Sequence, residues 1–280
     1  MSKDPYKATW VSHSSIGDFL KCPRAYYLHN VYKDPNTRRK INIVNPALSL
    51  GVAVHEVLEG LAKFKLEDRF NHSLFDDLEK AWSKVSGKRG GFKSLSEENE
   101  VKDRAKAMIK RALANPEPLQ KKIIKIKEGE NGLPPNFYLS EQDNIILCGK
   151  IDWLIWKPED DSLHILDFKT GKNEENEESL QLPIYQLLLK NLQKRKVTSA
   201  SYWYLDKDDK PIDVDLPDVD ESFERVYSIA NKIKNAREMG EFKCPRGEDG
   251  CFACRPFEKI LKGEAEYIGI GEMKQDLYMV

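Results

Sequence analysis

The sequence has no apolar run long enough to cross a membrane, and its first ten residues, MSKDPYKATW, lack the apolar core of a signal peptide. We therefore expect a cytoplasmic protein without a membrane partner. Cysteine is scarce, with five in 280 residues. Because thiols stay reduced in the cytoplasm, we expect these cysteines to be metal ligands or buried thiols and not disulfides.

An excess of charge of one sign is also missing. The 45 basic and 46 acidic residues leave a formal net charge of −1, so the chain as a whole is not a polycation. Any contact with nucleic acid must therefore come from local basic patches, although such runs are more often solvated faces. The candidates are Lys121, Lys122, Lys125 and Lys127, and the run Lys194, Arg195 and Lys196.

Several motifs that define enzyme classes are absent. The sequence has no GxxxxGKS/T phosphate-binding loop, no GxSxG nucleophile elbow and no HExxH zinc motif. The first absence excludes an ATP-driven motor within this chain. No internal repeat or Gly/Ser-rich linker divides the sequence, and its 40% hydrophobic and 32% charged residues are ordinary for a globular protein.

Periodicity and chain breakers predict a helical first part and a mixed sheet after it. The fold class is therefore α/β, with a mixed central sheet flanked by helices, an N-terminal helical cap and a C-terminal cysteine region. The tail 264–280 has little periodicity. Helices are expected over 12–32 with a break at Pro23, and over 46–65, 71–86, 96–115, 177–193 and 218–238, and strands over 136–142, 144–156, 163–171, 197–206 and 211–216.

The segments GKIDWLIW (149–156) and LHILDFKTGK (163–172) carry the strongest chemical signal. We expect Asp152 on the first strand and Asp167 and Lys169 on one face of the second, because side chains alternate along a strand. Two converging carboxylates suit Mg²⁺ or Mn²⁺. An ammonium beside them can hold a water and offset charge as a phosphodiester breaks. The alternative is a charged β-hairpin with a KTGK turn.

Two predicted helices carry further candidates. Gln181 and Tyr185 in QLPIY share a helix face that could grip a phosphate or a water, whereas the alternative is an ordinary amphipathic helix. Pro183 requires that this helix begin shortly before it. His55 in GVAVHEVLEG has Glu59 one turn further on, which could orient it. The alternative for His55 is a hydrogen-bonded histidine at a helix surface.

Four of the five cysteines form a second constellation. Cys22 lies in KCPRAYYL, and Cys244, Cys251 and Cys254 lie in FKCPRGEDGCFACRPF. A C-x2-C pair with two further thiols supplies four ligands, which suits an iron–sulfur cluster or a structural Zn²⁺. Buried free thiols are the alternative. Cys148 precedes the acidic segment and is expected in the core.

The order of these motifs resembles the PD-(D/E)XK nuclease superfamily. The opening SHSSIGDFLKCPRAYYL is similar to its RecB-like exonuclease branch, which includes the nuclease domains of RecB and AddB and the CRISPR-adaptation exonucleases. The resemblance runs from about Ser12 to Cys254. It implies that His55, Asp152, Asp167 and the backbone carbonyl of Phe168 hold the metal, that Lys169 is the catalytic lysine, and that Gln181 and Tyr185 belong to the same active site.

The resemblance also concerns the cysteines. AddB-like members hold a [4Fe–4S] cluster with one early and three late cysteines, which implies that cofactor for Cys22, Cys244, Cys251 and Cys254. This sequence departs from the family because the stretch PFEKIL after C-x2-C contains no cysteine, so Cys244 would have to substitute. Zn²⁺ stays the alternative.

The function implied by the resemblance is a metal-dependent DNA exonuclease that acts on single-stranded ends, in recombination or repair, phage DNA metabolism or CRISPR adaptation. The alternative is an iron–sulfur DNA-binding or scaffold subunit of such a complex with little nuclease activity. A zinc-binding regulator would leave the strand acids unexplained. Tyr26, Tyr27 and Trp203 are candidates for stacking on bases, although core packing is expected for each.

We expect a single nuclease domain over 1–280. Within it, 12–120 forms the helical part with the cap, 135–240 the α/β catalytic core, and 241–263 a cysteine-rich segment joined to Cys22. A homo-oligomer and a partner protein from recombination or CRISPR adaptation both stay open.

Overall fold

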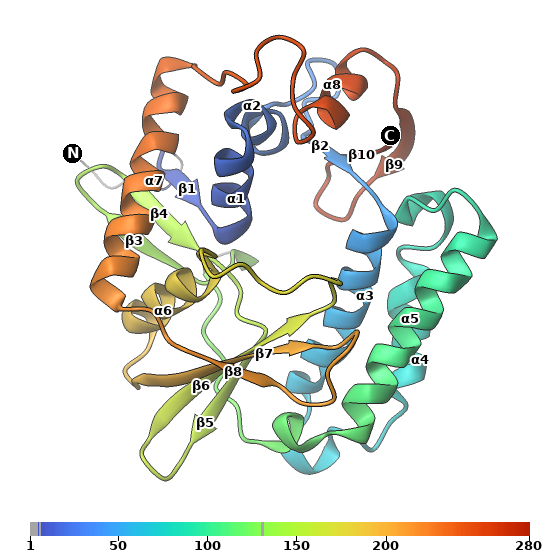
Figure 1. Ribbon diagram of the computed structural model, residues 1–280, viewed down its shortest axis with the longest axis vertical. Helices are drawn as coiled ribbons and strands as arrows, with labels where there is room; N and C mark the ends of the chain where they lie inside the picture. Colours follow the sequence, from blue (N-terminus) through green and yellow to red (C-terminus); the bar gives the residue numbers. More distant parts are fainter. Residues whose placement is uncertain (1–4, 6, 130–131) are drawn as a thin grey trace.

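A mixed four-stranded sheet forms the centre of the protein in the computed structural model, which describes residue 5 and residues 7–129 and 132–280 (Figure 1). The first and last pairs of strands are antiparallel and the middle pair is parallel, with a helix as the crossover that a parallel pair requires. This arrangement confirms the predicted mixed sheet. The elements are β5 (Trp153–Lys157), β6 (Ser162–Lys169), β7 (Val197–Tyr204), β8 (Ile212–Val214) and the crossover helix α6 (Gln181–Leu192).

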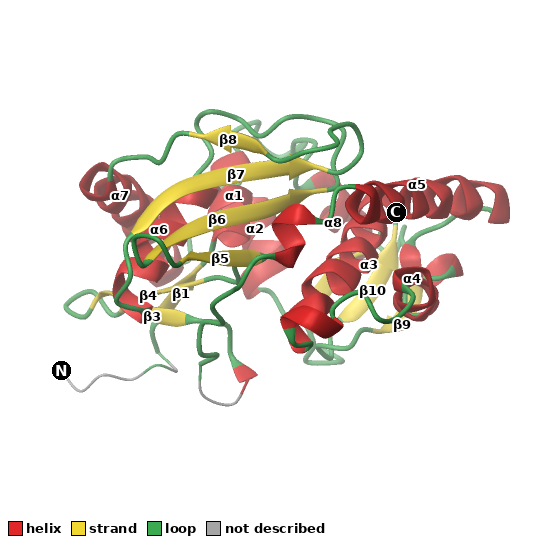
Figure 2. Ribbon diagram, turned by 90° about the horizontal axis from the view of Figure 1, so that it is seen from below, coloured by secondary structure: helices red, strands yellow, loops and turns green. Residues whose placement is uncertain are grey.

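Helices lie on both sides of this sheet (Figure 2). Each face of the sheet has its own apolar core. Ile165 of β6 packs toward α6 and α7, whereas Leu166 and Phe168 pack toward α3, α4 and α5. This alternation follows from the two-residue period of a strand. It confirms the predicted α/β class with flanking helices. The flanking helices are α1 (His13–Lys21), α3 (Pro46–Gly60), α4 (Leu74–Ser83), α5 (Leu95–Ala114) and α7 (Val219–Met239).

Local signals explain where the helices begin and end. Asn45 caps α3 by accepting a hydrogen bond from the Leu48 N–H, and Pro46 occupies the first turn. Gly240 follows α7 with a φ of 68°, a left-handed conformation that glycine adopts without strain. Pro23 separates α1 from the short α2 (Pro23–Tyr26), as the sequence predicted. Among the described residues, no helix combines the length and apolar composition needed to cross a bilayer.

Two small sheets flank the central one, and four of their strands were not predicted. Strand β1 pairs in parallel with β4, and β2 pairs in parallel with β10. The tail 264–280, which has little periodicity, forms a hairpin. These strands are only three to five residues long, so their partners far away in the chain define them and local periodicity does not. They are β1 (Thr9–Val11), β3 (Asn136–Ser140) and β4 (Ile145–Cys148), and β2 (Ile41–Ile43), β9 (Glu266–Ile270) and β10 (Asp276–Met279).

The single strand expected over 144–156 is two strands in different sheets. Strand β4 ends at Cys148 and β5 begins at Trp153, because the chain passes from one sheet to the other between them. Gly149 allows this passage, since a Cβ there would lie 2.9 Å from Cδ1 of Leu188 on α6. Asp152 therefore lies in the bend just before β5 and not on the strand, which corrects its expected position.

Candidate active site

The polar residues singled out in the sequence meet at the carboxyl end of β6. Their contacts join a helix on one side of the sheet to the crossover helix on the other. The structure brings every predicted member of this site together. Helix α3 supplies His55, the bend before β5 supplies Asp152, β6 supplies Asp167, Phe168 and Lys169, and α6 supplies Gln181 and Tyr185.

The side chain of Asp152 takes the place of a strand partner for β6, just beyond the last paired residue of β5. The ladder between these strands ends where Trp153 faces Leu166, so the next outward N–H group on β6 has no strand partner. The Oδ2 atom of Asp152 accepts a hydrogen bond from that N–H group, which belongs to Phe168, at 2.9 Å. The main chain of β6 thus fixes the carboxylate that lies nearest to α3.

His55 lies between two carboxylates. Its Nδ1 atom is 3.1 Å from Oε1 of Glu59 and 3.4 Å from Oδ2 of Asp152. Burial alone would lower the pKa of His55, but hydrogen bonds and charge attraction from Asp152 and Glu59 outweigh it and raise the pKa to about 10. One turn earlier on α3, Gly51 lets the helix approach β6, because a Cβ there would be 3.3 Å from Oγ1 of Thr170.

Asp167 is the most enclosed acid of the site, with 1% of its surface exposed. Its Oδ1 atom accepts hydrogen bonds from Nε2 of Gln181 at 2.6 Å and from the hydroxyl of Tyr185 at 3.2 Å. Burial first, and then the charge of Asp152, raise the pKa of Asp167 to about 7. The two residues of the QLPIY motif therefore hold this carboxyl group in place.

Lys169 is engaged by three groups around its ammonium. Its Nζ atom lies 2.9 Å from Oδ2 of Asp167 and 2.7 Å from Oε2 of Glu175, and it donates a hydrogen bond to Gln181. Burial would lower the pKa of Lys169, but the charge of Asp167 and the bond to Glu175 raise it. Lys169 is therefore a positively charged group at neutral pH and not a base.

Sequence reasoning missed two residues of this site. Glu175 comes from the loop between β6 and α6, which contains four glutamates and none of the residues singled out in the sequence. His13, the first residue of α1, lies close enough to Glu175 and Lys169 for their charges to influence its pKa, which burial lowers. Neither residue lies in a periodic pattern that singles it out. For Glu175, the only signal was its place six residues after Lys169.

A group of three side chains at this site has the spacing and chemistry of a metal site. His55, Glu59 and Asp152 each offer one ligand atom, and these atoms all lie within 4.8 Å of one another. Imidazole nitrogen and carboxylate oxygen both ligate divalent ions, so the donor set fits such an ion. Asp167 lies outside this group of three, with Oδ1 hydrogen-bonded to Gln181 and Tyr185 and Oδ2 paired with Lys169.

The four predicted cysteine ligands also come together. Cys22, Cys244, Cys251 and Cys254 are buried, and their sulfurs all lie within 4.8 Å of one another. Burial raises the pKa of a thiol, but the backbone N–H groups of Cys254 and Ala253 outweigh it at Cys251 and lower that pKa to about 7. The set includes Cys244, the cysteine that departs from the family pattern. Cys148 lies apart on β4, with its sulfur 3.5 Å from the Val11 carbonyl oxygen.

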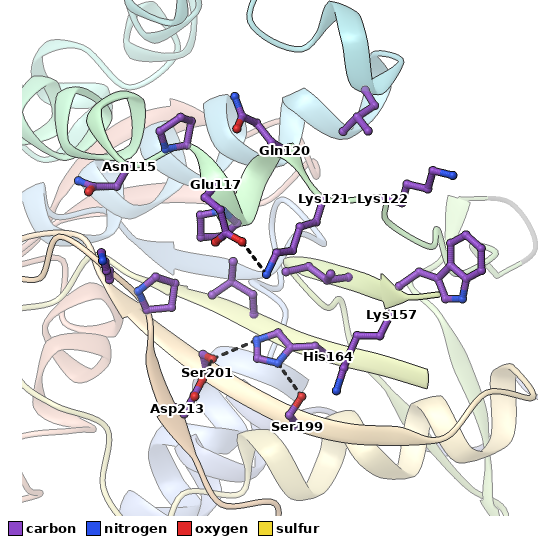
Figure 3. Close-up of a pocket in the computed structure, with 18 of the residues that line it drawn as sticks. Asn115, Glu117, Gln120, Lys121, Lys122, Lys157, His164, Ser199, Ser201 and Asp213 are labelled. Atoms are coloured by element: carbon purple, nitrogen blue, oxygen red, sulfur yellow. Dashed lines mark hydrogen bonds and ion pairs between the residues drawn. The ribbon is translucent and has the colours of Figure 1, made fainter. Parts of the chain in front are cut away.

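A large cavity of about 1040 Å³ lies away from these acids, beside the first half of β6 (Figure 3). His164 lines it from the face of β6 opposite Asp167, with Nδ1 2.8 Å from the Ser199 hydroxyl and Nε2 3.0 Å from the Ser201 hydroxyl. Ser201 donates its proton to Asp213 at 2.7 Å. Because the serine donates to the carboxylate and not to the histidine, this set is not the triad of a serine hydrolase.

The two basic runs and the three aromatic residues considered for nucleic-acid contact lie apart from the residues of the candidate active site or form ordinary structural contacts. In each basic run one residue, Lys121 or Arg195, forms an ion pair with a neighbouring carboxylate. Tyr26 and Trp203 are buried, one in each core, as expected from the alternative of core packing. Tyr27 is half-buried.

Comparison with known proteins agrees with this geometry. The family model of the PD-(D/E)XK nuclease superfamily matches residues 10–257. The chain belongs to the PD-(D/E)XK nuclease superfamily. The match includes every candidate residue of both constellations, from Cys22 to Cys254. Membership in the PD-(D/E)XK superfamily makes the chain a nuclease of a kind that uses divalent metal.

One solved structure extends over nearly the same length. It is the crystal structure of a presumed exonuclease from Eubacterium rectale, with a TM-score of 0.48 and 15% sequence identity over 91% of this chain and 92% of that chain. No curated protein matches the chain.

Proposed function

We propose that this PD-(D/E)XK nuclease is a metal-dependent DNA exonuclease that acts on single-stranded ends, in recombination or repair, phage DNA metabolism or CRISPR adaptation. One observation carries the proposal. Asp152 belongs to the three-donor group with His55 and Glu59, and its charge also acts on Asp167 beside Lys169. A candidate metal site and a fixed cation therefore adjoin at the end of one strand, and together they can stabilise the charge that develops as a phosphodiester is cleaved.

The donor set indicates which ion the site would take. His55, Glu59 and Asp152 would hold it, and the carbonyl of Phe168 joins them in the family pattern. Because one donor is an imidazole, Mn²⁺ suits the set better than Mg²⁺, which prefers oxygen alone. Such an ion, when bound, polarises a phosphoryl oxygen and makes a water more acidic.

The chain's own residues would do the rest. Lys169 keeps its positive charge and would offset the negative charge that develops on the phosphate. Gln181 and Tyr185 fix Oδ1 of Asp167, which leaves Oδ2, shared with Lys169, for the ion or its water. Burial keeps the pKa of Tyr185 well above its ordinary value, so its hydroxyl stays a neutral donor to Asp167.

Replacing the lysine tests this proposal. The variant Lys169→Ala should lose at least about a hundredfold in cleavage rate, because the site loses the cation that contacts Asp167. We would measure digestion of end-labelled single-stranded and duplex DNA with Mn²⁺, Mg²⁺ or EDTA. A circular single strand in the same assay separates exonuclease from endonuclease action, because it has no end.

An exposed lysine of α6 provides the control. Lys190 on α6 is exposed and lies 3.8 Å from Asp220, away from the acids, so Lys190→Ala should cleave like the wild type. Cleavage by Lys169→Ala at the control rate would remove the lysine from the mechanism. Wild-type protein that binds DNA but cleaves it with none of the ions would favour the scaffold function instead.

A further inference from the structure

The sulfurs of Cys22, Cys244, Cys251 and Cys254 form a compact set. All four lie within 4.8 Å of one another, and Sγ of Cys251 is 3.8 Å from Sγ of Cys254. Four sulfurs bound to one tetrahedral ion by bonds of about 2.3 Å stand about 3.8 Å apart. The observed spacing therefore fits one shared ion.

The same spacing does not fit the [4Fe–4S] cluster implied by the resemblance. In such a cluster each thiolate binds a different iron, so the four sulfurs must enclose the whole cube. Sulfurs that lie within 4.8 Å of one another leave no room for four irons and four sulfides between them.

Backbone N–H groups and a glycine in a left-handed conformation surround these sulfurs. The N–H group of Arg246 donates to Sγ of Cys244 at 3.4 Å, and the N–H group of Cys251 donates to Sγ of Cys254 at 3.1 Å. Such bonds stabilise thiolates, the form in which cysteine binds metal. Gly250 has a φ of +70°, and a Cβ there would lie 3.1 Å from Sγ of Cys254. Glycine adopts this left-handed conformation without strain, whereas a side chain here would crowd the sulfur.

We propose that these four cysteines hold a single tetrahedral ion, Zn²⁺, and not a [4Fe–4S] cluster. All four positions around the ion are filled by protein ligands, so its role is structural and not catalytic. It joins the chain just before α2 to the chain just before α8 (Arg255–Leu261), two helices that an ion pair between Arg24 and Glu258 also links (Figure 1). The proposal rests on the sulfurs alone and is independent of nuclease activity.

Metal analysis of the full chain tests this directly. We would purify it without oxygen, measure zinc, iron and acid-labile sulfide per chain, and record the visible spectrum. We expect one zinc, no sulfide and a colourless protein. Replacing zinc with Co²⁺ should give the intense visible bands of cobalt bound by thiolates at tetrahedral positions. This measurement needs no variant and so does not depend on whether a variant folds.

Two variants locate the ion. Cys254→Ser should lose the zinc and unfold at lower temperature, whereas Cys148→Ser, which alters the fifth cysteine, should keep one zinc per chain. Iron together with acid-labile sulfide would overturn the proposal in favour of a cluster. A folded chain without metal would overturn it in favour of free thiols, and one iron without sulfide would overturn the choice of zinc.

Discussion

At the scale of single residues, the position of Lys169 depends on an acid from outside the predicted motifs. Asp167 and Glu175 lie on either side of its ammonium, at 2.9 and 2.7 Å. Tyr202 adds its ring face, with the centroid 4.8 Å from Nζ. Because a long flexible side chain loses rotamer freedom when it is held in one place, each of these contacts contributes to keeping the lysine ready for substrate.

Glu175→Gln should therefore lower the cleavage rate by about ten- to a hundredfold while Lys169 stays charged through Asp167. The neutral amide still reaches Lys169 but attracts it less. Rates across a pH series separate positioning from loss of charge, since a positioning defect lowers the rate equally at every pH. Glu177→Gln, in the same loop and exposed, is the control. Equal rates for both variants would mean that Glu175 has no part in holding the lysine.

His164 in the large cavity predicts a pH effect on stability that is separate from catalysis. Burial lowers its pKa below the ordinary 6.5, so at mildly acid pH the unfolded chain binds a proton that the folded protein does not. The free energy of unfolding should therefore fall as the pH drops through 6.5 and below. His164→Gln should weaken this dependence, measured as the change in Tm between pH 8 and pH 5 relative to wild type. If Tm fell by the same amount in the wild type and in His164→Gln, the pH dependence would not come from His164.

The sequence predicted most residues of the site because they lie in regular elements. Asp167 and Lys169 share a face of β6, and Gln181 and Tyr185 share a face of α6, so strand and helix periods were enough to pair them. Glu175 could not be chosen from the four glutamates of its loop, because no period relates a loop residue to the site. The assignment of catalytic and metal-binding roles to these residues stays a prediction.

At the scale of elements, α3 and β6 must approach closely for the site to form. Gly51 and His55 are one turn apart on the helix, and the space for a side chain at Gly51 is limited by Thr170 at 3.3 Å. Thr170 directly follows Lys169. The small residue thus sets the distance between the helix with His55 and the strand end with the lysine.

Gly51→Val should push α3 away from β6 and reduce cleavage by about tenfold or more, because displacements on the order of 1 Å at a reacting site cost up to about a hundredfold. Gly60→Ala, on the same helix with open space around it, should cleave normally and gain about 0.5–1 kcal/mol in the free energy of unfolding. Steady-state rates and urea unfolding of the two variants provide the comparison. Full activity in Gly51→Val would show that the close approach is not required.

Long elements were predictable and short ones were not. Helix α7 was expected over 218–238 and occupies Val219–Met239, since it has a long amphipathic pattern and clear caps. Strands β1 and β2 have three residues each, too few to display a period. The prediction of one strand over 144–156 was wrong for another reason. A continuous apolar run does not reveal that its two halves enter different sheets.

At the scale of the whole molecule, the hairpin of β9 and β10 ties distant parts of the chain together. Asp276 on β10 is fully buried and accepts hydrogen bonds from the Thr37 hydroxyl and the Arg39 guanidinium. One apolar core contains residues of both 12–120 and 135–240, and the four sulfurs bring 241–263 to Cys22. We propose that the three parts therefore act as one nuclease domain. The cytoplasmic location and the oligomeric state stay predictions.

Asp276→Ala should destabilise the protein by about 1–3 kcal/mol, because it removes the hydrogen bonds that a buried carboxylate accepts from Thr37 and from the charged Arg39. The loss would appear as a lower midpoint in urea with an unchanged slope. Asp209→Ala removes an exposed carboxylate paired with Arg111 and should change the free energy of unfolding by no more than about 0.5 kcal/mol. Similar effects for both aspartates would mean that the hairpin does not anchor the fold.

The parallel pairing of β2 with β10 has a consequence for how the protein is made. Thr37, just before β2, and Asp276 are 239 residues apart, so β2 leaves the ribosome long before its partner exists. At about 5–20 residues per second, translation keeps this strand edge unpaired for some tens of seconds. An open strand edge is a template for aggregation, so nascent chains of this protein should depend on chaperones until residues 276–279 emerge.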